Sequence, residues 1–255
     1  MTDRTCLSYW FPILQKAGLP VPRTEIVRTE CRLWEILDGQ MPEGWKEFLA
    51  ELRTAVDKIG VPAFLRTGQT SGKHRWKRTC FLTDAAKLQD HVADLIEFSA
   101  LADFMGLATD VWAVREMLPT EPLCVLPAYG EFPLVKEVRC FVRGGEVVCW
   151  HNYWPEKAIY EGFLRRGRSL NSEGRSLPQN YADIVRATHD LNTKSFLPLA
   201  KRVAEAFAGD GAWSVDLLPT KDGRWFWFVT DMAEASKSFH WEGCEHAASF
   251  ASRRA

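Results

Sequence analysis

Residues 213–234 read WSVDLLPTKDGRWFWFVTDMAE, and this stretch decides the fold. Two apolar runs, Trp213–Leu218 and Arg224–Thr230, flank the dipeptide Asp222-Gly223. Asp-Gly between such runs is typical of two-residue turns, which join antiparallel strands whose twist they match. The stretch therefore predicts a β-hairpin close to the carboxyl end of the chain.

The predicted turn sets Asp216 opposite Val229 and Asp231 opposite Ser214. Because side chains alternate between the faces of a strand, the two aspartates then share one face as diagonal neighbours, with Cβ atoms about 7 Å apart. Converging carboxylates repel each other unless a cation lies between them, and oxygen ligands on a rigid sheet suit Mg²⁺. Glu234 is a candidate third ligand. The alternative is an exposed pair of aspartates without a metal.

A glycine-containing loop, Gly68–Lys77 (GQTSGKHRWK), lies between two expected strands, Val61–Thr67 and Cys80–Thr83. Its glycines would expose backbone N–H groups, and Lys73 and Lys77 add positive charge, which suits a polyphosphate. It is not a Walker A loop, because a strand follows it and the GxxxxGK[ST] spacing is absent. A flexible surface loop without a ligand is the alternative.

Charged residues interrupt two further apolar strands. Val111–Leu118 contains Arg115-Glu116, and Lys136–Val142 contains Glu137 and Arg139. Charges inside a buried strand need a partner or a ligand. These side chains are therefore candidate binding residues.

Gly144-Gly145 predicts a second hairpin, in which Cys140 faces Cys149 and Arg139 faces Trp150. Arg139 then has two open explanations. It either contacts a phosphate, or it pairs with a carboxylate or stacks on Trp150.

Composition excludes several classes of protein. The 255 residues are 46% apolar, and 32 Lys and Arg balance 33 Asp and Glu, which argues against binding by general neutralisation of nucleic-acid phosphates. The longest uncharged stretch, Thr5–Gln15, falls short of the roughly 20 apolar residues of a membrane span, so we expect none. The seven cysteines contain no CxxC pair, which favours buried reduced thiols over disulfides or a zinc site.

Helical patterns alternate with hairpins rather than forming βαβ units, so we expect an α+β fold with antiparallel sheets. Helices are predicted at Trp45–Ile59, from Thr83 to about Phe104, and at Phe196–Phe207. Residues 156–180 carry arginines among Gly, Ser and Asn without periodicity and predict a mobile basic loop. The tail, Glu242–Ala255, is predicted to be helical.

Several of these stretches, in this order, resemble ATP-grasp proteins over residues 61 to about 240. The stretch Lys136–Val142 resembles the E-F-R-x-F-V motif of the Cdc123-like and phage-associated (R-2-K-type) branches. Arg66 stands where many members have a phosphate-binding lysine. Ala233 stands where they usually have a metal-binding asparagine, so the number of bound magnesium ions, one or two, stays open. The other matching stretches are PAFLR (62–66) and CFLTD (80–84) of the nucleotide-covering lobe, VREML (114–118) of the hinge strand, and VDLL (215–218) and TDMA (230–233) of the metal-bearing strands.

The resemblance implies three segments: a reduced substrate lobe (1–58), a small lobe (61–118) and a large lobe (119–255), with ATP between the lobes. It also implies roles for the candidate residues. Those that would bind phosphates or line the base and ribose are Arg66, Lys73, Lys77, Arg115, Glu116, Met117, Leu118, Glu137 and Arg139. Arg139 and Lys73 would act on the transferring phosphoryl group, and Asp216, Asp231 and Glu234 would hold Mg²⁺.

The implied activity is that of an ATP-dependent ligase, which activates a carboxylate as an acyl phosphate for attack by an amine or another nucleophile. The acceptor stays open among a peptide, an amino acid and an RNA end, and the basic 156–180 loop leaves nucleic acid as a partner. The alternatives are a non-enzymatic ATP-binding assembly factor of the Cdc123 type and an RNA-repair factor. We expect a cytoplasmic protein without membrane contact, and the phage-associated branch is compatible with a phage origin.

Overall fold

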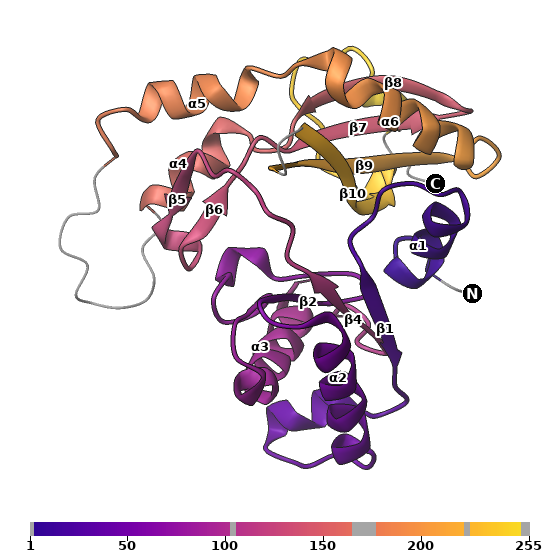
Figure 1. Ribbon diagram of the computed structural model, residues 1–255, viewed down its shortest axis with the longest axis vertical. Helices are drawn as coiled ribbons and strands as arrows, with labels where there is room; N and C mark the ends of the chain where they lie inside the picture. Colours follow the sequence, from indigo (N-terminus) through magenta and orange to yellow (C-terminus); the bar gives the residue numbers. More distant parts are fainter. Residues whose placement is uncertain (1–2, 103–105, 165–176, 222–224, 251–255) are drawn as a thin grey trace.

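A computed structural model describes residues 3–102, 106–164, 177–221 and 225–250. Two four-stranded antiparallel sheets, each covered by helices on one face, form the two lobes seen in Figure 1. The fold class expected from the sequence, α+β with antiparallel sheets, is confirmed. In chain order, the elements are α1 (Leu7–Lys16), β1 (Thr24–Arg28), η1 (Leu33–Asp38), α2 (Trp45–Ile59), β2 (Ala63–Thr67), η2 (Lys73–Arg75), β3 (Phe81–Leu82), η3 (Ala85–Lys87), α3 (Leu88–Leu101), β4 (Val111–Glu116), β5 (Cys124–Leu126), η4 (Pro127–Tyr129), β6 (Phe132–Leu134), β7 (Val138–Arg143), β8 (Glu146–Asn152), α4 (Glu156–Leu164), α5 (Tyr181–His189), α6 (Thr193–Ala206), β9 (Ala212–Lys221), β10 (Trp225–Glu234), η5 (Ala235–Lys237) and α7 (Ala247–Phe250).

The smaller sheet has the strand order β1-β4-β2-β3, and α2 and α3 cover one of its faces. Alternation along the strands divides their side chains. Leu65 and Trp112 pack into the core beneath the two helices. Phe64, Arg66 and Arg115 point to the other face, which looks toward the larger lobe.

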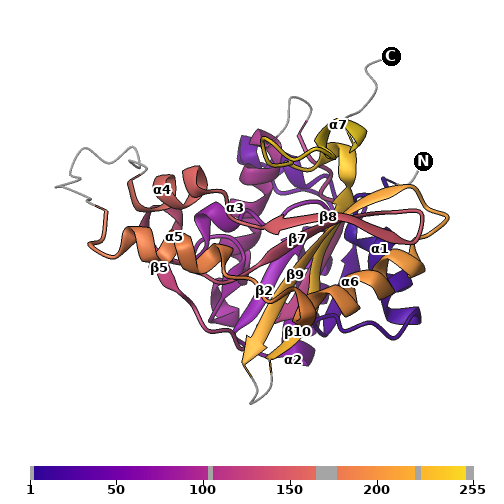
Figure 2. The ribbon, with the colours of Figure 1, turned by 90° about the horizontal axis from the view of Figure 1, so that it is seen from above.

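The larger sheet has the strand order β10-β9-β7-β8. Helices α1 and α6 pack on one face, where Cys140, Val215 and Leu217 lie in one core with Trp10 and other helix residues. The opposite face carries Arg139, Phe141, Ser214 and Asp216, because these alternate with the core residues. Figure 2, turned by 90°, shows α6 and α1 on the same side of this sheet.

The β5–β6 hairpin, together with α4 and α5, builds a third apolar cluster that includes Trp76, Tyr129, Phe132 and Trp154. Trp76 comes from the glycine-containing loop of the smaller lobe and packs against Phe132 with ring centroids 5.1 Å apart. This cluster therefore joins the loop to the larger lobe.

The register of the C-terminal hairpin differs from the prediction. Asp231 lies directly opposite Asp216, not diagonal to it, for two reasons. The pairing is already one residue out of the predicted register next to the turn, where Lys221 pairs with Trp225, and a bulge at Thr230 shifts it by one more residue between Val229 and Asp231. The bulged residue, Thr230, makes two hydrogen bonds. Its hydroxyl donates to the Asp216 carbonyl at 3.2 Å, and its backbone carbonyl accepts from Arg115. The predicted turn at 222–223 lies outside the described residues.

The second hairpin also carries a bulge. Arg143 pairs with Glu146 as expected, but the register shifts after Phe141, so Phe141 faces Cys149 and Arg139 faces His151. The predicted pairs Cys140–Cys149 and Arg139–Trp150 are therefore wrong by one residue. A one-residue bulge changes which side chains face each other across two strands. The pattern of apolar and polar residues along either strand does not indicate where the bulge lies.

Two element predictions need correction. Residues 156–164 form α4 rather than loop, and residues 165–176 of the expected basic loop lie outside the described residues. Of the tail, only Ala247–Phe250 is helical in the described part. No helix among the described residues has the length and apolarity to cross a bilayer.

Candidate functional site

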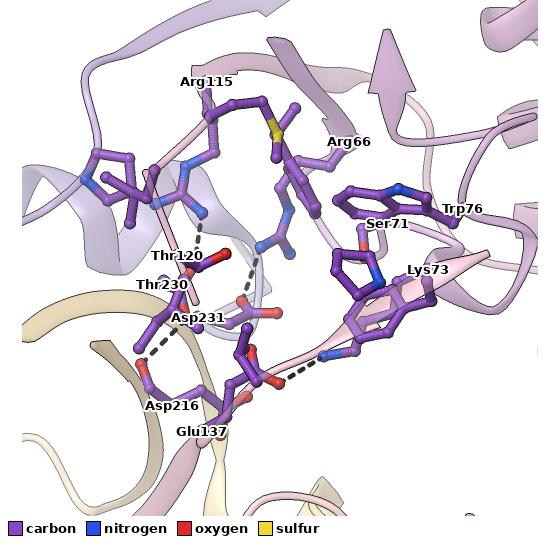
Figure 3. A pocket seen from close by; sticks show the side chains of 18 of the residues that line it. Arg66, Ser71, Lys73, Trp76, Arg115, Thr120, Glu137, Asp216, Thr230 and Asp231 are labelled. Carbon is purple, nitrogen blue, oxygen red and sulfur yellow. Dashed lines mark hydrogen bonds and ion pairs between the residues drawn. The ribbon is translucent and has the colours of Figure 1, made fainter. Parts of the chain in front are cut away.

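A cleft with about 790 Å³ of empty space, partly open to solvent, lies where the uncovered faces of the two sheets meet. One end is apolar and the other is charged, as Figure 3 shows. The apolar lining consists of Pro22, Phe64, Trp76, Met117, Leu118, Phe132, Pro133, Val135 and Leu218.

Two arginines of the smaller sheet point into the charged end. In the register of β2 and β4, Phe64 faces Arg115 and Arg66 faces Ala113, so the two guanidinium-bearing residues are diagonal neighbours on one face. Both side chains are almost completely buried. The small side chain of Ala113 opposite Arg66 leaves room on this face for the long arginine.

Arg115 is a buried cation that no carboxylate of the described residues binds directly. Its Nε donates to the Thr24 hydroxyl at 3.2 Å, Nη1 donates to the Thr230 carbonyl, and Nη2 has no hydrogen-bond partner in the described part of the chain. Burial, and next the charge of Arg66, lower the pKa of Arg115 to about 9. It remains a cation at neutral pH, and an anion in the cleft would relieve its unfavourable environment.

Two carboxylates from the larger sheet face these arginines (Figure 3). Arg139 donates to both oxygens of Asp216, at 2.7 and 2.9 Å, in a bidentate pair. Asp231 accepts at Oδ1 from Arg66 (2.8 Å) and from its neighbour's amide, whereas its Oδ2 has no hydrogen-bond partner among the described residues. The Asp231 side chain is 42% exposed and that of Asp216 only 8%.

The Lys73 ammonium pairs with another carboxylate that lines the cleft, that of Glu137. It is 3.8 Å from Glu137 Oε2 and 3.8 Å from the centre of the Tyr153 ring. Burial alone would lower the pKa of Lys73, but Glu137, Tyr153 and Asp216 outweigh it and raise the pKa. Glu137 also accepts from Trp154 Nε1 at 2.8 Å, so its carboxylate holds Lys73 in place.

The glycine-containing loop holds side chains, not the Gly68 amide, toward the cleft. The amide of Gly68 donates to the Val111 carbonyl at 2.7 Å and is already used. A Cβ on Gly68 would lie 2.4 Å from Cys6 Sγ and 3.0 Å from Val111 Cβ, so the close approach of the chain explains this glycine. Ser71, Lys73 and Trp76 line the cleft instead.

The structure does not bring every candidate residue to the cleft. Lys77 is on the outer side of the loop and pairs with Glu131. Glu234 pairs with Arg4 at 3.3 Å and Lys237 at 3.1 Å, away from the two aspartates. The cleft or its immediate border holds the other candidates, namely Arg66, Lys73, Arg115, Glu116, Met117, Leu118, Glu137, Arg139, Asp216 and Asp231.

Sequence reasoning missed three aromatic residues of this region. Trp76 and Phe132 line the cleft, and Tyr153 lies under both Lys73 and Arg139, with the Arg139 guanidinium 4.6 Å from its ring centre. Trp76 could have been found, because a large apolar side chain inside a polar glycine-containing loop is unusual. Tyr153 and Phe132 carry no such signal.

The donor set around the two aspartates fits Mg²⁺. They lie opposite each other on adjacent strands, one Asp231 oxygen lacks a partner within the described ranges, and each Asp216 oxygen retains a lone pair beyond its arginine bond. Mg²⁺ is usually bound by one or two carboxylates, with phosphate oxygens and water completing an octahedron. Glu234 lies elsewhere, so Asp216 and Asp231 are the predicted metal ligands that remain in the cleft.

A family model and several solved structures match this chain. A family model described as the ATP-grasp domain of R-2-K clade family 3 matches residues 55–226. No curated protein sequence matches the chain. C-terminally truncated Cdc123 from Schizosaccharomyces pombe has a TM-score of 0.52 at 13% identity, with 90% of this chain and 83% of that chain covered.

The RimK domain ATP-grasp protein from Sphaerobacter thermophilus has a TM-score of 0.43 at 16% identity; the match covers 90% of this chain and 57% of that one. The chain thus spans little more than half of that protein. At 13% identity the Cdc123 structure shows the likeness of the fold alone, whereas the family model covers more than half of the chain. The chain therefore belongs to the ATP-grasp family, in family 3 of the R-2-K clade.

Proposed function

We propose that the cleft binds ATP together with Mg²⁺ and that the chain is an ATP-dependent ligase. The observation that carries this proposal is Arg115, a buried guanidinium that faces the cleft and whose Nη2 has no partner among the described residues. A buried cation of this kind is costly unless an anion accompanies it. The triphosphate supplies that anion, next to the apolar part of the cleft lining.

The base and ribose would occupy the apolar end. Phe64 and Trp76, with ring centroids 6.0 Å apart, and Met117 flank this end. The Glu116 carboxylate accepts from the backbone amide of Arg23 at 2.7 Å and from its Nε at 2.9 Å. We infer that Glu116 chiefly shapes the entrance, while the chain at Met117 and Leu118 meets the base.

The phosphates would lie among Arg66, Arg115 and Lys73. Asp216 and Asp231 would hold Mg²⁺, which supplies positive charge to phosphate oxygens when it is bound. Arg66 and Arg139 already neutralise these two aspartates. Both arginines can therefore turn from the carboxylates to phosphate oxygens without leaving the carboxylates unpaired when the metal is present.

The reaction we propose is transfer of the γ-phosphoryl group to a carboxylate. A carboxylate oxygen bonds to the γ-phosphorus, the bond from that phosphorus to ADP breaks, and an amine then displaces phosphate from the acyl carbon. In such transfers the protein mainly positions the groups and stabilises developing charge. Lys73 and Arg139 are suited to this role, since both are buried cations at the phosphate end.

The test is ADP release from Mg²⁺-ATP by the purified chain, measured with pools of carboxylates and amines, peptides and RNA ends. Release that depends on one acceptor pool supports a ligase. Tight ATP binding without turnover in any pool would contradict the ligase and favour the assembly-factor alternative. Absence of ATP binding would contradict the whole proposal.

A further inference from the structure

A second group of potential ligands lies outside the cleft. It consists of two cysteines and two histidines, Cys149, His151, His240 and Cys244. One ligand atom of each lies within 4.8 Å of the other three. Cys149 Sγ is 3.4 Å from His240 Nε2. All four residues are only partly exposed, so the group is sheltered from solvent.

Two short sequence spacings produce this convergence. Cys149 and His151 are two residues apart on β8, so both side chains point to the same face of the sheet. His240 and Cys244 are separated by three residues in the segment that follows η5. A search for CxxC pairs does not find this pattern, because each cysteine is paired with a histidine and the halves are far apart in the chain.

The imidazoles are held in place by aromatic rings, yet each has a buried nitrogen without a hydrogen-bond partner in the described part of the chain. His151 stacks on Trp241 with centroids 4.8 Å apart, and His240 stacks on Phe141 at 4.0 Å. The atoms concerned are His151 Nε2 and His240 Nδ1. Buried polar atoms are almost always satisfied, so His151 Nε2 indicates a ligand. In His240 the other nitrogen, Nε2, is the one that faces Cys149.

We propose that Cys149, His151, His240 and Cys244 form a tetrahedral zinc site. Two thiolates and two imidazoles are a usual donor set of structural Zn²⁺, and four protein ligands leave no open position for catalysis. With Zn–S of about 2.3 Å and Zn–N of about 2.0 Å, the ligand atoms of a tetrahedral site are roughly 3.3–3.8 Å apart. The observed separations reach this range with small side-chain rotations, while each thiol releases its proton.

The zinc would fasten the C-terminal segment to the larger sheet. Strand β8 is the edge of that sheet, and Trp241 and Phe250 of the segment after β10 pack against residues of β7 and β8. Figure 2 shows α7, which ends this segment, close to β8. Among the described residues, the apolar cluster there has three buried members, Phe141, Ala235 and Phe250. Such a small core gains stability from a metal, because structural zinc binding contributes directly to folding.

The experiment is zinc analysis of the full-length protein purified with reductant and without added chelator. We expect one zinc per chain. Cys244→Ser and His240→Ala should lose most of the metal, whereas the controls Cys124→Ser and His246→Ala should retain it. Cys124 is another half-buried thiol, and His246 lies in the same segment but pairs with Glu245.

Two measurements on the unchanged protein keep the test independent of variant folding. A strong chelator should lower the Tm, and added Zn²⁺ should restore it. Co²⁺ in place of zinc should give the intense visible absorption of a tetrahedral thiolate site. A metal content near zero after refolding with Zn²⁺, the same content in wild type and Cys244→Ser, or a Cys149–Cys244 disulfide in the purified protein would each overturn the proposal.

Discussion

At the scale of single residues, the cleft is defined by buried charges that the fold alone does not need. Arg66 and Arg115 lie side by side on one sheet face, and the resulting repulsion adds to the cost of burying each. Replacing buried ion pairs by apolar groups of similar size is often neutral or stabilising, and an unpaired buried charge is costlier still. Side chains kept at such a cost point to a ligand.

Arg115→Met should therefore separate stability from binding. We expect the Tm of the protein without nucleotide to change by less than about 4 °C, because the relief from burying a cation offsets the lost hydrogen bonds to Thr24 and Thr230. ATP affinity should fall roughly 10- to 100-fold, because a hydrogen-bonded charge on the phosphates is lost. Thermal unfolding and calorimetric titration measure the two effects. A lower Tm with unchanged affinity would show that Arg115 serves only the fold.

Lys73 and Lys77 provide a matched pair in one loop. Lys73 lies in the cleft beside Glu137, and Lys77 pairs with Glu131 outside it. Lys73→Met should slow ADP release by roughly tenfold or more, since a cation at the phosphate end is removed. Lys77→Met should leave the rate nearly unchanged. Equal effects of the two substitutions in a turnover assay would place the phosphates elsewhere.

At the scale of elements, sequence periodicity predicted the strands and the paired aspartates but not their register. Each of the two hairpins contains a one-residue bulge, at Thr230 and after Phe141. The bulge at Thr230 is stabilised by tertiary partners, Arg115 and the Asp216 carbonyl, which lie far away in the sequence or on the next strand. Local patterns contain no information about such partners.

The loop after β2 depends on close contact with α1 and β4. Gly68→Ala would bring a Cβ to 2.4 Å from Cys6 Sγ, so one of the segments must move. We expect a loss of about 1 to 3 kcal/mol in the free energy of unfolding. Gly209→Ala is the control, because no atom of the described residues lies within 4 Å of its Cβ. Denaturant unfolding measures the stability of both variants. Equal unfolding midpoints for Gly68→Ala and Gly209→Ala would contradict the close packing around Gly68.

At the scale of the whole molecule, the N-terminal residues contribute to both lobes, an arrangement that the sequence did not reveal. Helix α1 lies in the core beneath the larger sheet, while β1 and α2 belong to the smaller lobe. The expected division into segments 1–58, 61–118 and 119–255 remains a prediction. Contacts between distant segments depend on the complete fold, so residue spacing alone does not predict them. The group of Cys149, His151, His240 and Cys244 is an example.

ATP should stabilise the molecule as a whole, because its proposed site combines side chains from both lobes. At an ATP concentration of about 100 times Kd, the free energy of unfolding should rise by about 2.7 kcal/mol. A thermal shift with Mg²⁺-ATP measures this, with AMP as the control, since AMP lacks the phosphates that Arg115 and Lys73 would meet. Equal shifts with both nucleotides would contradict the assignment of the charged end.

The central claim is that Mg²⁺ and ATP bind between the two sheets. Asp231 and Glu234 test it most directly, because both are carboxylates of β10, and Asp231 lines the cleft whereas Glu234 does not. The measurement is ATP affinity by calorimetry, with and without Mg²⁺. Asp231→Asn should lose the Mg²⁺-dependent part of the affinity, and Glu234→Gln should match the wild type. Unchanged Mg²⁺-dependent binding in Asp231→Asn would contradict a metal-nucleotide site between the two sheets.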